Sequence, residues 1–302
     1  MKKSITLGMF LIVNLFVFAG CPNSKSAQMT NELRFSLKGI LSLTLSYDEE
    51  KITILESDSD ALVIKEYMTE NKSSYYAKVT EDNESIYITE GGKPFFKDGF
   101  FRYIEVYLPE AYRENLTVTS TNGDIDFSGM NLDLSMLRVD NSSGNIRLDN
   151  AVASNIHLSS TSGTLDLGNI EANQISLETT SGSVICTKLN GDVTYTSTSG
   201  SADIKSAIGS GSYKANNSGG LNVVYTEVSG DLSFFNKNDS ITLTLPENLE
   251  FEFQAITKNG SVSTNFQQDV TVNGHTTSGS VGSNPIVTVK VETNNGDIEV
   301  TH

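Results

Sequence analysis

A short turn that ends in glycine recurs along most of this chain, at intervals of 17 to 21 residues. In each copy a run of Ser, Thr or Asn precedes the glycine, as in the segment Thr179-Thr180-Ser181-Gly182. A near-constant period of this size is typical of a solenoid, in which each repeat stacks on the next. The turn residues are Gly123, Gly144, Gly163, Gly182, Gly200, Gly219, Asp239, Gly260, Gly279 and Gly296, with Asp239 in the one slot that lacks glycine.

Apolar residues alternate with polar ones on both sides of each turn. After one turn the apolar residues are Ile146 and Leu148, and before the next they are Ile156 and Leu158. Alternation with a period of two indicates strands with one buried face. Two half-buried strands cannot form a core alone, so the coils must stack to bury one. We therefore predict an all-β fold, a right-handed parallel β-solenoid with coils of about 19 residues and a loose corner in each coil.

Some copies depart from this pattern. Before Gly219 the inward positions hold Ser212 and Lys214, while Tyr213 and Ala215 stand one place off, which predicts a bulge or a register shift. The copies at Gly260 and Gly279 have weak second strands. We expect the C-terminal end to be looser, or to pair differently.

The N-terminus has the features of a targeting segment. Lys2 and Lys3 precede a mostly apolar run over residues 5–18, and Phe18-Ala19-Gly20-Cys21 follows. Residues 1–20 resemble a bacterial lipoprotein signal peptide, and the resemblance implies cleavage before Cys21 and lipidation of that cysteine. An ordinary secretory signal is the alternative, and the run is short for a transmembrane anchor. Residues 21–32 are polar and small, which predicts a flexible tether.

The chain is strongly acidic. It carries 21 Lys and Arg against 37 Asp and Glu, a net charge of −16. Cleavage of the leader would remove two lysines and make the charge −18. Such a charge opposes binding to nucleic acid and to anionic lipid surfaces. Contact with a membrane would therefore go through the lipid on Cys21.

Residues 33–115 also alternate, but less regularly than the rest. We predict that they form an irregular N-terminal β cap, and that 116–302 form the solenoid domain. A solenoid end exposes apolar core and unpaired edges, so it needs such a cap. The loop 91–101 contains four Phe and is expected to fold over the mouth of the solenoid. A separate small β domain, and an exposed Phe binding patch, are the alternatives.

A family resemblance follows from the start of the repeats. The segment Tyr107-Leu108-Pro109 is followed by Asn115-Leu116-Thr117-Val118-Thr119-Ser120-Thr121-Asn122-Gly123-Asp124-Ile125, and then by serial Thr-Ser-Gly units. The chain from Leu33 to His302 resembles the DUF4097 family of adhesin-like bacterial β-strand repeat proteins. The resemblance implies a right-handed β-solenoid on the bacterial envelope, and it brings no catalytic motif.

The sequence contains few groups that suggest chemistry. His157, His275 and His302 have no zinc or triad spacing, so we expect solvated side chains and no catalytic, cofactor or metal site. Cys186 occupies an inward position, which predicts a buried apolar role; a reactive thiol is the alternative.

One pair of outward carboxylates keeps an enzymatic alternative open. Asp166 and Asp203 would lie two coils apart, which loosely meets the spacing of an inverting glycosidase. The alternative function is therefore a polysaccharide hydrolase or lyase of the β-helix type.

The hydroxyl-rich turns would stack into a stripe. Ser, Thr and Asn bond their own backbone in turns and Gly supplies a positive φ, so turn chemistry explains the pattern. A binding surface for a glycan or a protein is the functional alternative. Its candidate residues are Thr161, Ser162, Thr180, Ser181, Thr198 and Ser199.

These observations together favour a non-enzymatic, lipid-anchored protein of the bacterial cell envelope. We expect it at the periplasmic face or the cell surface, with an adhesin-like binding or scaffolding role. A domain that senses envelope stress is a further alternative.

Overall fold

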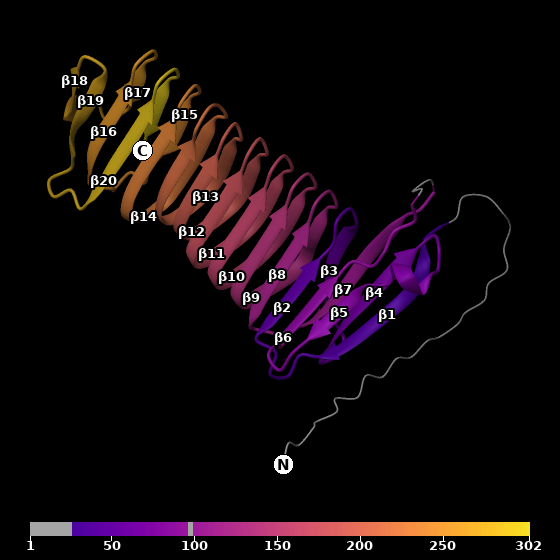
Figure 1. Ribbon diagram of the computed structural model, residues 1–302. Coiled ribbons are helices and arrows are strands. Elements are labelled where there is room, and N and C mark those ends of the chain that lie inside the picture. Colours follow the sequence, from indigo (N-terminus) through magenta and orange to yellow (C-terminus); the bar gives the residue numbers. More distant parts are fainter. Residues whose placement is uncertain (1–25, 96–98) are drawn as a thin grey trace.

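The computed structural model describes residues 26–95 and 99–302, so the predicted leader and Cys21 lie outside the described residues. Figure 1 shows stacked strands that form a rod, with the N-terminal strands at one end and the C-terminal strands at the other. The described elements are strands, apart from two short 3-10 helices, η1 (Ser73–Tyr75) and η2 (Gln267–Asp269). The all-β prediction is confirmed, and most of the strands pair in parallel. In the described part of the chain, no helix has the length and apolar character that a membrane crossing requires.

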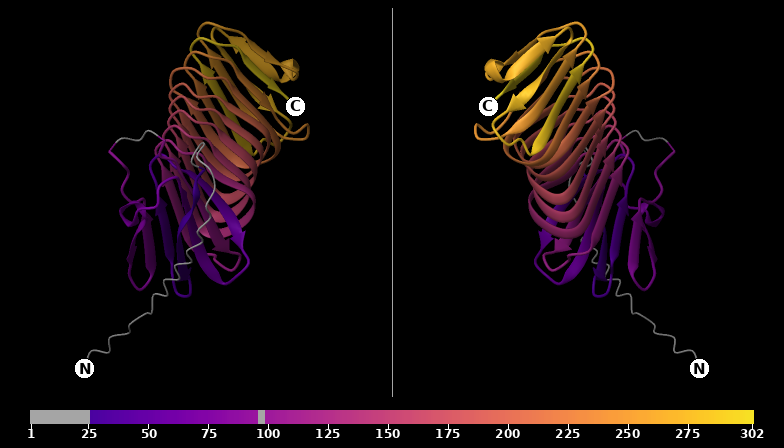
Figure 2. Two further views of the ribbon diagram at one scale, coloured as in Figure 1. Left: turned by 90° about the vertical axis from the view of Figure 1, so that its right-hand side faces the viewer. Right: turned by 90° about the vertical axis from the view of Figure 1, so that its left-hand side faces the viewer.

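The middle of the rod consists of long strands, each running from one glycine turn to the next. Ile146 pairs with Leu165 and Leu165 with Val184, so these partners are 19 residues apart. The corner that we expected to be loose is part of the ladder, because Ile170 pairs with Leu189 there. Figure 2 shows the strands bending as they pass from one side of the rod to the other. These strands are β9 (Ile125–Asn141), β10 (Ile146–Ser160), β11 (Leu165–Thr179), β12 (Val184–Ser197), β13 (Ala202–Ala215) and β14 (Leu221–Asn236).

The alternating apolar residues form one continuous core along the rod. Leu158 and Leu177 are buried beside each other on neighbouring coils. Further along, the core becomes aromatic, and the rings of Tyr213 and Phe234 stack at 4.7 Å. Full burial of one such side chain stabilises the fold by about 1.5–3 kcal/mol.

The turn glycines are required by close stacking rather than by backbone conformation. Of the glycines in the predicted turn row, Gly219 has a positive φ, at 105°. The predicted reason, a positive φ at each turn, is therefore wrong for the others. A Cβ on Gly163 or Gly182 would instead lie under 3.0 Å from the carbonyl oxygen of the glycine one coil earlier. Only a residue without a side chain allows this approach.

A buried polar side chain stands three residues before most of these glycines. The Gly123 amide donates to Ser120 Oγ at 3.0 Å, and the Gly163 amide donates to Ser160 Oγ at 2.9 Å. Asn141 Nδ2 donates to the Gly123 carbonyl at 2.7 Å, so it links two coils. These side chains satisfy turn groups that burial would otherwise leave unpaired. The buried polar set includes Ser120, Asn141, Ser160, Thr179, Ser197, Asn236, Thr257 and Thr293.

The irregularity before Gly219 is resolved in the turn. Tyr213 pairs with Tyr195 and Ala215 with Ser197, without a bulge between β12 and β13. The extra residue therefore lies between Ala215 and Gly219, and this longer turn keeps both Tyr213 and Ala215 buried. The predicted register shift is confirmed, and β13 also pairs irregularly with β14, with one of the irregularities between Gly209 and Gly211.

At the C-terminal end, spatial order differs from chain order. β20 (Val287–Thr293) lies between β14 and β16 (Phe251–Thr257), parallel to both. β21 (Ile298–Thr301) lies likewise between β15 (Ile241–Thr244) and β17 (Val262–Thr264).

An antiparallel hairpin follows β16 in space and covers this end of the rod. It consists of β18 (Val270–Asn273) and β19 (Thr276–Val281). Gly279 lies inside β19, so its assignment to the turn row is wrong. The expected change of pairing at this end is confirmed.

The N-terminal end has the same arrangement. β2 (Ser42–Ser46) lies between β6 (Ser85–Thr89) and β8 (Asn115–Ser120), parallel to both. β3 (Lys51–Ser57) lies between β7 (Arg102–Pro109) and β9. The parallel stack thus begins within the region 33–115.

Antiparallel strands complete this end. β4 (Ala61–Met68) pairs with β7, β1 (Gln28–Ser36) pairs with β4, and β5 (Lys78–Glu81) pairs with β6. Because β1 begins at Gln28, residues 28–32 are a strand rather than part of the predicted tether. Backbone pairing with β4 fixes them.

The Phe-rich loop does not cover the mouth with its described residues in the way we expected. Phe101 is 56% exposed and Phe95 is also exposed, whereas Phe100 packs edge-on against Tyr75 with 5.4 Å between the ring centroids. Residues 96–98 lie outside the described part.

A buried ion cluster sits in the cap beside the first turn of the parallel stack. Arg102 Nη2 lies 2.7 Å from Glu50 Oε1 and 3.3 Å from Glu90 Oε2, and Lys93 Nζ lies 2.9 Å from Glu90 Oε1. Burial, followed by the hydrogen bond with Glu50, raises the pKa of Glu90 to about 7. Burial alone would raise the pKa of Glu50 too, but hydrogen bonds with Glu90 and Arg102 outweigh it and lower that pKa. Glu90 therefore keeps its proton to a higher pH than an exposed glutamate does.

We predict that Gly163→Ala destabilises the rod. Its new methyl group would clash with the Gly144 carbonyl, so the free energy of unfolding should fall by about 1–3 kcal/mol in urea denaturation. Gly220→Ala is the matched control, because the nearest atom to its Cβ is 4.0 Å away. It should change stability by about 0.5 kcal/mol at most. Equal effects of the two changes would contradict the stacking explanation.

We also predict that Glu90 makes cap stability depend on pH. A carboxyl whose pKa is raised on folding stabilises the fold below its unfolded pKa, and this contribution is lost as pH rises through the folded value. Stability should therefore fall between about pH 4.5 and pH 7, and Glu90→Gln should flatten this decline. Urea denaturation at pH 5 and pH 8 measures it, with exposed Glu171→Gln as the control. If the free energy of unfolding of Glu90→Gln fell with pH as steeply as that of the unchanged protein, Glu90 would not be the cause of the decline.

Candidate functional site: a groove along the corner of the coils

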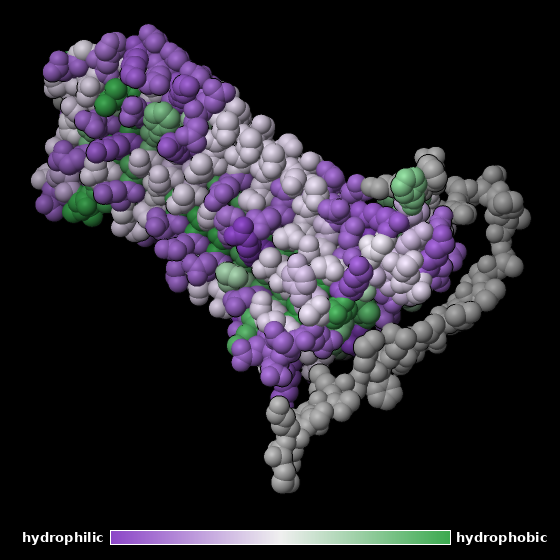
Figure 3. All heavy atoms as spheres, in the orientation of Figure 1, coloured by the Kyte–Doolittle hydropathy of each residue, from purple (hydrophilic) through white to green (hydrophobic). Residues whose placement is uncertain are grey.

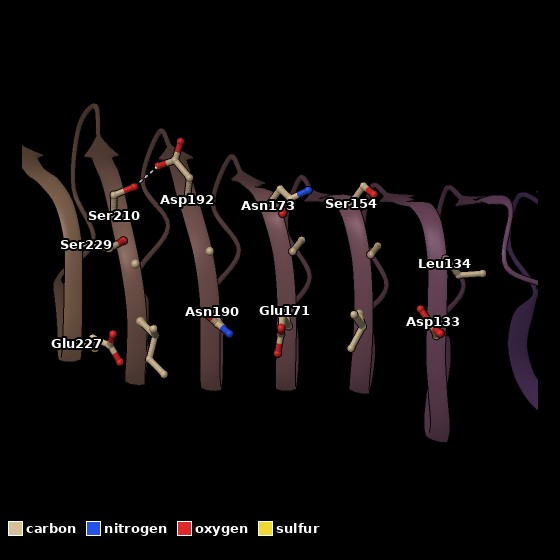
Figure 4. Close-up of a pocket in the computed structure, with 16 residues that line it drawn as sticks. Asp133, Leu134, Ser154, Glu171, Asn173, Asn190, Asp192, Ser210, Glu227 and Ser229 are labelled. Carbon is tan, nitrogen blue, oxygen red and sulfur yellow. Dashed lines mark hydrogen bonds between the residues drawn. The ribbon is translucent and has the colours of Figure 1, made fainter.

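A hollow runs along the corners of β9 to β14, where each long strand bends. Its volume is about 730 Å³, and consecutive coils each contribute lining residues. Figure 4 shows how these side chains follow one another from strand to strand. Because the corner lies midway between successive turns, the groove is at the far end of the coil from the glycine row.

The floor of the groove is made of very small residues. Ala153, Ala172, Gly191 and Gly209 line it on successive coils, where Ala153 pairs with Ala172 and Gly191 pairs with Gly209. Gly191 and Gly209 have φ of 149° and 119°, and a Cβ on either would meet a carbonyl oxygen of the previous coil. Larger side chains would fill this space, so the small residues create the hollow.

One rim alternates carboxylates with apolar and amide side chains. In pairing order it reads Asp133, Val152, Glu171, Asn190, Ile208 and Glu227. No two carboxylates of this rim are on adjacent coils, which avoids direct repulsion between like charges. Arg113 Nε lies 3.1 Å from Asp133 Oδ2 and neutralises one end of the rim.

The other rim carries short polar side chains. Ser154, Asn173, Asp192, Ser210 and Ser229 line it, and Ser210 Oγ donates to Asp192 Oδ1 at 2.7 Å. Among the described residues that line the groove, none is Lys, Arg or His. The groove therefore offers hydroxyl, amide and carboxylate groups, a set that suits a neutral or basic ligand.

A second hollow of about 470 Å³ adjoins the groove and shares Val152 and Glu171 with it. Here Asn131, Asn150 and Asn169 stand on neighbouring coils, and Asn169 Nδ2 donates to Asn150 Oδ1 at 2.8 Å. The amide ladder extends the polar surface on the acidic side. Together the two hollows suit a chain-like ligand that lies along the rod.

The predicted stripe residues lie at the turns, away from the groove. Thr161, Ser162, Thr180, Ser181 and Thr198 are exposed and Ser199 is half-buried. Backbone bonds hold them in line, since the Ser181 amide donates to the Thr161 carbonyl and the Ser199 amide to the Thr180 carbonyl, both at 2.7 Å. The stripe and the groove are thus two separate surfaces.

The two carboxylates behind the enzymatic alternative are separated by an apolar side chain. Ile185 pairs with both Asp166 and Asp203 and is 46% exposed. Asp203 is also engaged, because Lys205 Nζ lies 2.6 Å and Asn222 Nδ2 2.8 Å from its oxygens.

His157 points outward as expected, but it is not simply solvated. Its ring nitrogens lie 3.4 Å from Asp140 Oδ1 and 3.9 Å from Glu178 Oε1, on the neighbouring coils. Burial would raise the pKa of Asp140, but hydrogen bonds from His157, Ser159 and Arg138 outweigh it and lower that pKa to about 2. Parallel register could have revealed these neighbours. Within the described residues, no His, Cys, Asp and Glu are grouped to hold a metal ion.

Cys186, His275 and His302 each pack against or hydrogen-bond with other parts of the fold. Cys186 is buried, which confirms the apolar interpretation, and burial raises the pKa of its thiol to about 12. His275 Nδ1 lies 3.1 Å from the Thr257 carbonyl oxygen. The His302 ring packs 5.4 Å from the ring of Phe266.

Comparison with solved structures found several similar chains. Among solved structures, a proposed cell adhesion protein from Clostridium sporogenes is 14% identical, with a TM-score of 0.26, and the match covers 90% of this chain and 98% of that one. A proposed adhesin from Bacteroides fragilis is 10% identical, with a TM-score of 0.46 and coverage of 89% and 95%. One from Parabacteroides distasonis is 12% identical, with a TM-score of 0.38 and coverage of 89% and 96%.

Sequence comparison gives the family. A search of curated proteins found no match. The family model described as Toastrack DUF4097 matches residues 40–301, which is most of the chain and includes every coil of the rod. The chain therefore belongs to the Toastrack DUF4097 family.

Proposed function

We propose that this chain is a non-enzymatic, lipid-anchored protein of the bacterial envelope that binds an extended polymer in an adhesin-like manner. The corner groove carries the proposal, because it crosses successive coils and has a polar rim on each side of a small-residue floor. The leader and Cys21 in the sequence support the envelope location and the lipid anchor.

The groove chemistry favours a neutral or basic polymer, such as an uncharged glycan or a basic extended peptide. Hydroxyl and amide groups on both sides can exchange hydrogen bonds with a polar ligand, and the Ala and Gly floor lets a ring or a backbone approach closely. The carboxylates Glu171, Asp192 and Glu227 would repel a polyanion.

Support for a non-enzymatic role comes from how the outer groups are occupied. Asp203 is paired with Lys205, and an exposed Ile185 separates it from Asp166. The groove is lined by residues of hydrogen-bonded strands rather than by loops. Such strands hold their side chains in fixed positions, which suits the binding of a ligand in one orientation.

The test is an array of glycans and extended peptides probed with the purified fragment 22–302. We expect saturable binding of neutral or basic polymers and no binding of polyanions. We predict that Asn173→Arg, which places a long side chain over the groove, weakens binding at least tenfold, or about 1.4 kcal/mol.

The matched control is Thr180→Arg, which introduces the same residue at an exposed stripe position close in the chain to Asn173. It should leave binding unchanged. If Thr180→Arg abolishes binding while Asn173→Arg does not, the ligand lies on the stripe and the groove assignment is wrong. Binding of polyanions alone, or of no polymer, would overturn the proposed ligand class.

A further inference from the structure

An exposed apolar patch lies on the outer face of the cap, across β1, β4 and β7. Met29 stands opposite Tyr67, and Tyr67 opposite Tyr103, so the three share one face of the sheet. The Tyr67 and Tyr103 rings stack at 4.5 Å, and the Phe101 ring is 6.0 Å from Tyr103. Met29 is 46% and Phe101 56% exposed. These four residues are called the cap patch below.

Other large apolar side chains, such as Val272 and Ile286, are also exposed, but the cap patch brings several aromatic and apolar side chains together on one face. Figure 3 shows a surface on which apolar residues occur in small groups among polar ones. Fully exposed apolar side chains cost solubility, and a group of them marks a contact surface. Tyrosines and a phenylalanine at one edge are also the residue types that favour the boundary between a membrane and water.

The position of the patch indicates which surface it meets. Met29 is the second residue of β1, and only residues 22–27 separate that strand from Cys21. A fully extended chain from Cys21 to Gln28 spans at most ~25 Å. A lipid on Cys21 would therefore hold the start of β1, and the patch beside it, close to the bilayer.

The polar groups around the patch are compatible with this contact. The Tyr67 and Tyr107 hydroxyls both donate to Glu105 Oε2, at 2.9 and 2.8 Å, so the carboxylate is partly shielded. Lys65 Nζ lies 4.3 Å from the centre of the Tyr107 ring. The full chain has a net charge of −16, which cleavage of the leader would make −18. This charge disfavours anionic lipids, so the expected surface is zwitterionic.

We propose that the cap patch of Met29, Tyr67, Phe101 and Tyr103 rests in the interfacial region of the bilayer that anchors the protein. The proposal rests on the proposed function, because it requires the lipid on Cys21. The lipid supplies the affinity, and the patch sets which side of the cap faces the membrane. The β18–β19 hairpin is at the opposite end of the rod (Figure 1).

The chain has no Trp, which allows a sharp test. Phe101→Trp places a single fluorescent reporter in the patch, and Val272→Trp, at a position 70% exposed in β18, places the matched control at the far end. Fragment 21–302 is coupled through Cys21 to a maleimide lipid in phosphatidylcholine vesicles. Cys186 is buried and does not compete for coupling.

We predict a blue shift of the Phe101→Trp emission on coupling, and severalfold stronger quenching by lipids spin-labelled near the headgroup than for Val272→Trp. Equal emission of Phe101→Trp with and without vesicles would overturn the proposal, and so would equal quenching at both sites.

Because the lipid is attached chemically, this test does not depend on natural processing. The anchor is tested separately, by the mass of the N-terminal peptide from membranes of cells that produce the full chain, with Cys21→Ser as the control. An unmodified peptide would contradict the lipid anchor of the proposed function and leave the vesicle result standing.

Discussion

The close stacking of turn backbones is the constraint on which the rest of this rod depends. A Cβ at Gly163 or Gly182 would collide with the carbonyl oxygen of the previous coil, so these positions admit only glycine. The same closeness buries turn amides and carbonyls, and a Ser, Thr or Asn three residues before the turn residue hydrogen-bonds to several of them. Part of the polar character of the repeat is therefore structural, because Ser160 and its equivalents point inward. In each turn, only the two residues that follow the buried polar side chain, such as Thr161 and Ser162 after Ser160, are available to a ligand.

Each end of the rod faces a second problem, which is the open edge of a parallel stack. An unpaired edge invites association with another chain. At each end, two strands that are distant in the chain insert between strands of the parallel stack: β2 and β3 at the N-terminal end, and β20 and β21 at the C-terminal end. Antiparallel strands then pair with the outermost parallel strands. Val289 pairs with Leu232, 57 residues away, and Leu43 pairs with Ile86. Each inserted strand pairs with a neighbour on both sides, as β20 does with β14 and β16. Local unfolding of an end coil therefore has to break the backbone hydrogen bonds on both sides of the inserted strand.

The sequence reveals the coils well because their partners are local and repeated. Apolar alternation around Gly144 and Gly163 is enough to identify the inward residues. It cannot identify the order of the terminal coils, because a run of Ser, Thr or Asn precedes both Gly279 and Gly296, while one lies in a hairpin strand and the other in the turn stack. The groove was missed for another reason. Its signals are Ala172, Gly191 and Gly209, which in sequence read as a loose corner, and only the register places them on one floor.

Glycine therefore has two roles that follow from one property, the absence of a side chain. At the turns it brings backbones together, and at the corners it removes the atoms that would fill the groove. The carboxylates Asp133, Glu171 and Glu227 are two or three coils apart, or about 10–14 Å at ~4.8 Å per coil. A short ligand can reach only one of them, whereas a polymer along the rod reaches all three. Affinity should then rise with ligand length because each added contact is intramolecular, and a rigid rod keeps these contacts in register.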